Sequence, residues 1–492
     1  MNARSRWKPG TPRTLAGASL LATLLAGCAG LAPPGGGAAD CSALFAQLQQ
    51  ATREHRDAQY QRLADWPGLR SDRLLASLGA DARTAEQRRL WAQRLATHDA
   101  EASQVEIAQL APAQRHIWRS DERQQALDSC RSAQVRRLSE DPHAFSDAAA
   151  AARVPDDYHD WARMLGLNPL FKPVFGWGVA AWQRAAARAR MPEDGPQWLS
   201  YAPLRQASPT QPVRLQPDAL GLPQADGAGL DALFARHAPR LRIEQASRSD
   251  RIGSPYFAVD GARRFNAQQP RLYRHSGWSR INGRWHLQLV YQLWFDRRPK
   301  PHALDLYGGE LDGLLWRVTL DARGNALLYD SIHPCGCWHG FYLPRHSPLR
   351  FRQPPNEESR LARRLGLDGT QAPTLWLSAG THHLVWVDER RSPYPALHYR
   401  QDALDQLRRL PHPGGRRSLY ASDGMVPGSQ RLERWLLWPS GVPRRAPCAN
   451  GAPRHGLHRP RPLRRSAPAA TLLPLSGPRA TLSRPPRQFP PR

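Results

Sequence analysis

The spacing of apolar residues changes near residue 200, and this change constrains the fold most. From Asp40 to about residue 190, apolar side chains recur at helical spacing, as at Leu44, Phe45 and Leu48. Beyond a Pro-rich stretch the pattern becomes alternation, which is typical of strands. We therefore predict an α+β fold with a helical domain at 40–200 and a linker at 201–229. A β-rich, mainly antiparallel domain is expected at 230–440.

Turn signals divide this second half into strands. Asn282-Gly283 is a two-residue hairpin signal, and the residues from Trp285 to Phe295 then alternate apolar side chains. A second hairpin is predicted with its turn at 321–325. Residues 374–377 and 384–387 form another expected strand pair. The charged stretch 351–367 has a helical pattern and is predicted to be a surface excursion.

The densest chemistry lies between Asp330 and His339, where His333, Cys335, Cys337 and His339 occupy every second position. On a flat strand such side chains stand about 7 Å apart, too far to share one tetrahedral zinc ion. Pro334 and Gly336 interrupt the strand, so a turned loop could bring the ligands together. The candidate metal ligands are His333, Cys335, Cys337, His339, His382 and His383, with His302 as a further histidine, and zinc is the candidate cofactor.

A disulfide between Cys335 and Cys337 is the alternative, either structural or in a thiol-redox role. Free thiols, or pairing with Cys448, remain open. The spacing differs from Cys-x-x-Cys-His, which disfavours c-type haem.

Four carboxylates precede this segment, at Asp305, Glu310, Asp312 and Asp330. With histidines they would suit acid-base or metal-assisted hydrolysis. The glycines around residue 310 favour an ordinary turn instead. Whether the chain is an enzyme stays undecided, and its catalytic residues stay unassigned.

The N-terminus predicts secretion. Basic residues precede an apolar run from Leu15 to Leu25 that is too short to span a bilayer. The run ends in Leu25-Ala26-Gly27-Cys28, which resembles the lipobox of bacterial lipoproteins. The resemblance implies a signal peptide at 1–27 and an acylated Cys28, carrying lipids such as palmitate. Ala29 after the cysteine implies sorting to the outer membrane, and residues 28–39 form a Gly/Pro/Ala tether.

Cys41 and Cys130 are the only cysteines in the expected helical domain. In an oxidising periplasm they are expected to form a disulfide, and buried free thiols are the alternative.

The formal net charge is +27. Residues 1–27 contribute four basic side chains and residues 441–492 contribute eleven arginines, both without acids, which leaves +12 for the rest. The excess is therefore largely terminal, and no recognition motif accompanies it. Nucleic acid is not an expected partner.

Residues 441–492 are Pro, Arg and Ala without alternation, which predicts a disordered tail. Back-translating residues 446–467 with GC-rich codons and reading one nucleotide along can yield acids, histidines and a strand-like run. We therefore hypothesise a reading-frame shift, with a genuine basic tail as the alternative.

The middle of the chain resembles a family of uncharacterised proteobacterial lipoproteins. The resemblance rests on residues 154–158, 291–295, 311–313 and 333–337, and it implies no known activity. We expect an outer-membrane lipoprotein that faces the periplasm, with a structural or interaction role and an envelope protein as partner. In this interpretation the segment from Asp330 to His339, here called the Cys/His segment, stabilises the sheet. The alternative is a metal-dependent hydrolase or thiol-redox enzyme centred on His333, Cys335, Cys337 and His339.

Overall fold

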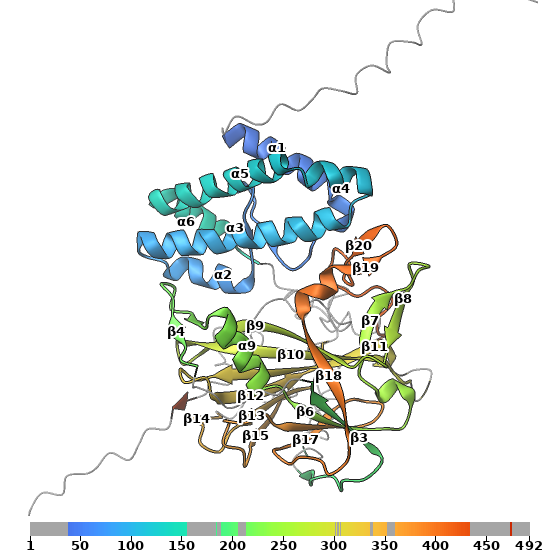
Figure 1. Cartoon of the computed structure of the whole chain (residues 1–492). Coiled ribbons are helices and arrows are strands. Elements are labelled where there is room, and N and C mark those ends of the chain that lie inside the picture. The colour runs from blue at the N-terminus through green and yellow to red at the C-terminus, as the bar shows by residue number, and fades with distance from the viewer. Residues whose placement is uncertain are drawn as a thin grey trace, which may run out of the picture.

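The computed structural model describes residues 38–154, 184, 188–204, 213–300, 302, 305, 307–334, 338–351, 360–432 and 473–474. Within these residues the protein has seven helices and one large sheet, so the α+β class is confirmed. The helices before residue 152 form a layer, here called the helical layer, beside the sheet (Figure 1). The expected signal peptide, Cys28, Cys335, Cys337 and almost all of the tail lie outside the described residues.

The helical layer contains six helices with short local connections. They are α1 (Ala38–Ala51), α2 (Arg73–Leu78), α3 (Ala85–Ala108), α4 (Pro112–Trp118), α5 (Asp121–Glu140) and α6 (Pro142–Ala151), with the strands β1 (Gln61–Arg62) and β2 (Arg70–Ser71) and the short helices η1 (Arg53–His55) and η2 (Gly79–Asp81). The first turns are capped by side chains: Thr84 and Gln87 form a capping box on α3, and Ser120 and Asp141 cap α5 and α6. These contacts satisfy backbone N–H groups that helix ends leave without partners.

Two apolar cores hold the helical layer. One packs α1 against α3, α4 and α5, and Cys41 is bonded to Cys130 within it. This is the cysteine pair that the sequence predicts. The second core includes Leu220 and Leu222, which lie beyond the expected helical domain. The boundary between the helices and the rest of the chain is therefore bridged by shared apolar packing.

A buried ionic network joins β2, α3 and α5 in the helical layer. Glu106 accepts hydrogen bonds from Arg70 at 2.7 and 2.9 Å, while Asp99 binds both Arg70 and Arg131. All four side chains are buried, so each charge needs its partners to offset the loss of water.

The sheet has eleven strands in the order β15-β13-β12-β11-β10-β9-β18-β3-β6-β16-β17. Their bounds are β3 (Trp198–Pro203), β6 (Arg240–Glu244), β9 (Arg271–Ile281), β10 (Arg284–Arg298), β11 (Gly309–Leu320), β12 (Ala326–Ile332), β13 (His339–Leu343), β15 (Arg360–Arg364), β16 (Thr374–Leu377), β17 (Leu384–Asp388) and β18 (Ala396–Ala403). The other described elements are β4 (Gln216–Pro217), β5 (Pro223–Gln224), α9 (Gly227–Arg236), η3 (Arg248–Asp250), β7 (Ser254–Phe257), β8 (Arg263–Asn266), β14 (Leu349–Arg350), η4 (Leu404–Arg408), β19 (Leu410–His412), β20 (Gly415–Arg417) and β21 (Leu473–Pro474).

The sheet is mixed: of the ten pairs between its described strands, six are antiparallel and four are parallel. Neighbouring strands joined by turns pair antiparallel, but β13–β15, β16–β6, β18–β3 and β18–β9 pair parallel. These parallel partners are distant in sequence, and turn signals carry no information about such pairs. β3 also begins inside the stretch predicted to be helical and ends inside the expected linker 201–229.

The three predicted strand pairs are confirmed. β9 and β10 flank Asn282 and Gly283, whose φ angles of 50° and 82° fit the left-handed conformations of a tight hairpin. β11 pairs with β12, and β16 with β17. The main core contains the predicted apolar face of β10, and α9 packs on it through Phe234, which lies edge-on to Tyr291.

Candidate functional site

A buried histidine between two carboxylates lies at one end of the central strands. His382 Nδ1 is 2.7 Å from Asp312 Oδ2, and His382 Nε2 is 3.3 Å from Asp250 Oδ1. The imidazole stacks on Phe295 with 3.7 Å between ring centroids. All three polar side chains are buried. We call Asp250, Asp312, His333, His382 and His383 the Asp/His centre.

Local backbone geometry places these groups. His382 lies in the turn between β16 and β17 and has a positive φ of 54°, which is uncommon for a side-chain-bearing residue. Asp250, at the end of η3, accepts N–H groups of Gly380 at 2.6 Å, Ser247 at 2.7 Å and Ala246 at 2.9 Å. Leu311, just before Asp312, also has a positive φ, of 52°. Strained backbone at several positions of one cluster requires support from the surrounding contacts.

The centre is a set of compensated charges. Burial acts against ionisation of Asp250, Asp312 and His382, but the contacts among these three side chains outweigh it. Burial lowers the pKa of His382, yet the hydrogen bonds and charges of Asp250 and Asp312 raise it overall. Burial raises the pKa of Asp312, yet His333 and His382 hold it well below its usual range. The pKa of Asp250 is lowered through His382 and its backbone donors despite burial. The arrangement favours an imidazolium between two carboxylates.

This electrostatic balance predicts a pH dependence of stability. Because the folded-state pKa of His382 is raised, its contribution is fully present below the unfolded value of about 6.5 and is lost as pH rises through the folded value. The stability difference between the wild type and His382→Asn should therefore shrink with rising pH, measured by urea unfolding at a series of pH values. His398→Asn changes an exposed histidine on β18 and is the control. A difference that grows with pH would contradict this assignment.

The lowered pKa values of Asp250 and Asp312 make stability depend on pH in the acid range. Asp250 and Asp312 contribute stability that is present above the unfolded pKa of about 3.9 and is lost as pH falls through their folded values.

His333 and His383 extend the centre toward the Cys/His segment. His333 Nδ1 lies 3.7 Å from Asp312 Oδ1, beyond hydrogen-bonding distance, and the rings of His333 and His383 meet edge-on at 5.3 Å. Within the described structure, His333 Nε2 and His383 Nε2 are buried without a hydrogen-bond partner. Burial and the charges of His333 and Arg298 lower the pKa of His383 to about 2, so its ring is neutral.

His339 belongs to a different cluster. Its Nε2 lies 3.0 Å from Arg317 Nη2 and 3.1 Å from Asp330 Oδ1, and Arg317 Nε donates to Asp330 at 2.6 Å. Arg317 and Asp312 are five residues apart on β11, so their side chains lie on opposite faces of the sheet. The structure thus brings His333, His382 and His383 together and places His339 apart from them.

The expected metal ligands fit this geometry only in part. His382 Nδ1 is hydrogen-bonded to Asp312 and its Nε2 lies 3.3 Å from Asp250 without hydrogen-bond geometry, whereas the Nε2 atoms of His333 and His383 are buried without a partner among the described residues. Among the residues described on either side of 335–337, no group of three or more His, Cys, Asp or Glu side chains could hold a metal ion. Cys335 and Cys337 lie outside those residues. His302 is exposed.

The four carboxylates of the sequence pattern separate into two kinds. Asp305 accepts the N–H groups of Tyr307 and Gly308, and Glu310 forms an ion pair with Arg263 near the surface. Asp305 thus forms a turn, whereas Glu310 lies on β11, which begins at Gly309, so the turn predicted around residue 310 is wrong. Asp312 and Asp330 are buried partners of histidines. Asp250 was missed because its only local signal is the Ser247–Asp250 capping pattern of η3.

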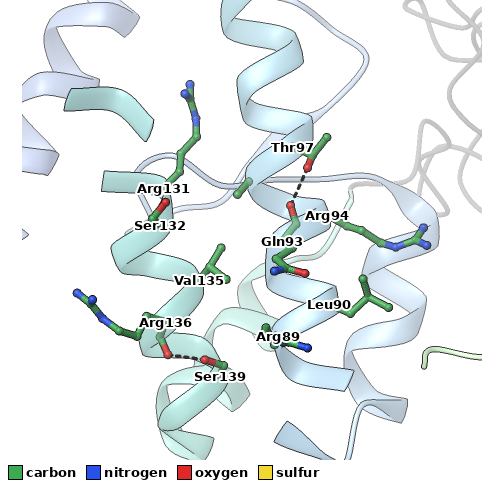
Figure 2. A pocket seen from close by; sticks show the side chains of 11 residues that line it. Arg89, Leu90, Gln93, Arg94, Thr97, Arg131, Ser132, Val135, Arg136 and Ser139 are labelled. Carbon is green, nitrogen blue, oxygen red and sulfur yellow. Dashed lines mark hydrogen bonds between the residues drawn. The ribbon is translucent and has the colours of Figure 1, made fainter. Parts of the chain in front are cut away.

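The larger of two described cavities lies elsewhere. A groove of about 790 Å³ between α3 and α5 is lined by four arginines, Arg89, Arg94, Arg131 and Arg136. Figure 2 shows Arg94, Arg131 and Arg136 pointing in different directions, and Arg131 is held by Asp99 and Asp128. The guanidinium groups therefore do not converge on one ligand position.

Comparisons with protein-family models, with curated proteins and with solved structures found no match. In the described part of the chain, no helix combines the length and the apolar character needed to span a membrane.

Proposed function

We propose that the protein is a lipid-anchored cell-envelope protein, attached to the outer membrane through Cys28 and facing the periplasm, with a structural or interaction role. The Leu-Ala-Gly-Cys sequence before residue 29 supports the attachment. The position of α1 is compatible with it, because this helix begins at Ala38, within a few residues of the expected tether. The bond from Cys41 to Cys130 would then link the first helix after the anchor to α5.

The helical layer is proposed to be a domain that bears the anchor, and the sheet a second domain that holds the Asp/His centre. The core formed by α1, α3, α4 and α5 lies entirely within the helical layer and supports this division. Leu220 and Leu222 would join the two domains.

One observation carries the proposed role of the centre. His382 is fully buried, each of its ring nitrogens faces a carboxylate, and its ring is covered by Phe295. A general acid or base needs hydrogen-bonding access to a substrate atom. The contacts of His382 are instead those of a charge that fixes the β16–β17 turn to β11 and η3. We therefore assign the centre a structural role, in which the Cys/His segment helps to maintain the sheet.

Membrane attachment is tested by Cys28→Ala. The variant is expected to leave the membrane fraction and to retain its unprocessed signal, because the acylated sulfur is missing. Fractionation and the mass of the N-terminus measure both effects. Cys448→Ser is the matched control, since it removes a cysteine outside the signal and outside the Cys41–Cys130 bond and should stay membrane-bound. A normally processed, membrane-bound Cys28→Ala protein would refute the anchor.

A metal-dependent hydrolase or thiol-redox enzyme is the second candidate. The buried Nε2 atoms of His333 and His383 favour it, because buried polar atoms normally have partners. Asp312 lies behind His333, as the carboxylate does in carboxylate–histidine–zinc arrangements. With a thiolate from Cys335 or Cys337, these imidazoles would make a ligand set that zinc accepts. Bound zinc would supply a Lewis acid, and His333 and His383 would hold it.

A further inference from the structure

A second cavity lies between the helical layer and the sheet. It has a volume of about 520 Å³ and is lined on one side by the loop before β1, by α2 and by α3. The other side is formed by α9, β9, η4 and Tyr420. Ligand sites of proteins commonly have volumes of about 300 to 1,000 Å³ and often lie between domains. The cavity therefore has the size and the position of a small-molecule site.

Aromatic rings form much of its wall. Tyr60, Phe234, Trp278 and Tyr420 all line it, and Tyr60 stacks on His98 with 4.0 Å between ring centroids. A guanidinium carbon lies over three of these rings: Arg408 lies 5.5 Å from the Tyr60 ring centroid, Arg274 4.9 Å from that of Phe234 and Arg94 5.3 Å from that of Trp278. The Trp278 indole also donates to the Pro223 carbonyl at 2.9 Å. The rings are thus held in place before any ligand arrives.

The charges of the lining are balanced. The lining contains four carboxylates and four arginines. These are Asp72, Glu101, Asp231 and Asp405, and Arg94, Arg274, Arg408 and Arg409. Several are paired: Arg274 binds Asp231 at 2.6 Å, and Glu101 accepts the Tyr60 hydroxyl at 2.7 Å. An ion entering this cavity would lose water without meeting a net opposite charge. The lining therefore disfavours a strongly anionic or cationic ligand.

Hydrogen-bond donors and acceptors nevertheless surround the rings. Carboxylates accept, guanidinium groups donate, and the histidines do either. Burial raises the pKa of Asp72 to about 6, although its backbone donors and Arg94 act against this, so this carboxyl can also donate a hydrogen bond below about pH 6. A ligand that matches such a lining is neutral, has an apolar ring face and carries many hydroxyl groups.

We propose that the cavity between the helical layer and the sheet binds a short neutral saccharide. The apolar face of a sugar ring packs on the partly buried Trp278 indole, and its hydroxyl groups bond to Glu101 and the neighbouring guanidinium groups. The proposal stands on the cavity alone and does not depend on the lipid anchor or on the Asp/His centre.

The test uses the full chain purified in a detergent without a sugar headgroup. The N-acetylglucosamine trimer and maltotriose are titrated by calorimetry and tryptophan fluorescence, with sulfate as the charged probe. At least one trisaccharide should bind with millimolar or tighter affinity. Trp278→Ala and Glu101→Gln should each weaken binding by about tenfold or more, as loss of about 1.4 kcal/mol implies. Trp278→Phe, which keeps a ring, should retain part of the affinity.

Arg136→Gln, in the groove between α3 and α5, is the matched control and should leave binding unchanged. Thermal unfolding shows whether each variant is folded, and Trp278→Phe is the readout if Trp278→Ala does not fold. Failure of both trisaccharides to bind, preferential binding of sulfate, or equal loss in Arg136→Gln overturns the proposal. If the protein is retained on insoluble chitin but does not bind the N-acetylglucosamine trimer, the proposal is also overturned, because a cavity between two layers admits only short chains.

Discussion

Asp312→Asn is expected to lower the free energy of unfolding by about 3 to 5 kcal/mol. The side chain is buried, with His382 at 2.7 Å and His333 at 3.7 Å. Removing its charge while keeping its shape leaves the buried imidazolium with Asp250 alone, and breaking a buried pair costs more than the pair contributes. Urea unfolding at neutral pH measures the loss.

Glu310→Gln is the matched control for this prediction. Glu310 lies two residues away on β11 and forms its ion pair with Arg263 at the protein surface, with 62% of its side chain exposed. Surface pairs contribute about 0 to 1 kcal/mol, so the control should change little. Equal losses in the two variants would show that the Asp/His centre does not hold the sheet.

The double variant Cys41→Ser/Cys130→Ser is expected to lose about 4 to 5 kcal/mol of stability. The bond joins positions separated by 89 residues, and the chain-entropy model assigns a large effect to a loop of this length. Both sulfurs are also buried in the core of α1, α3, α4 and α5. Chemical unfolding with and without reductant measures the effect, since reductant should destabilise the wild type more than the double variant.

Peptide mapping under non-reducing conditions provides the independent check. A peptide that contains both Cys41 and Cys130 should appear and should separate on reduction. If both thiols can be alkylated in the folded protein, Cys41 and Cys130 are not bonded to each other.

Local sequence patterns predicted the strands that are joined by turns. Asn282-Gly283 specifies a turn whose twist matches its strands, and alternation from Trp285 to Phe295 specifies the buried face of β10. The same reasoning placed β11, β12, β16 and β17. In each case the pairing partner is the next strand, so periodicity and turn chemistry suffice.

Pairs between distant segments could not be predicted in this way. β15 carries three arginines among its five residues and follows a helical pattern, yet it pairs parallel with β13. β3 ends in a proline inside a Pro-rich stretch and still occupies an interior position, between β18 and β6. Tertiary partners decide such cases, because strand preference depends on the surrounding packing more than on the isolated residue.

Sequence patterns predicted only part of the candidate site, because some of its residues come from distant segments of the chain. His333, His382 and His383 were selected for their residue types, and the structure places them around Asp312. Asp250 reaches His382 from η3, more than one hundred residues away, and no spacing rule relates the two. His339 shares the alternation of His333 in the sequence but lies with Arg317 and Asp330 on the other face. Pro334 and Gly336 interrupt the strand, which predicts that regular alternation does not continue from Asp330 to His339.

The metal content and thiol count of the purified protein test the central claim, which is the structural role of the Asp/His centre and the Cys/His segment. Elemental analysis is made on the full chain as isolated, and thiols are counted under denaturing conditions with and without a chelator. A structural role predicts less than stoichiometric zinc and no change in thiol count on chelation. One zinc per chain, with Cys335 and Cys337 as free thiols once the metal is removed, would contradict it and favour the metal-dependent enzyme.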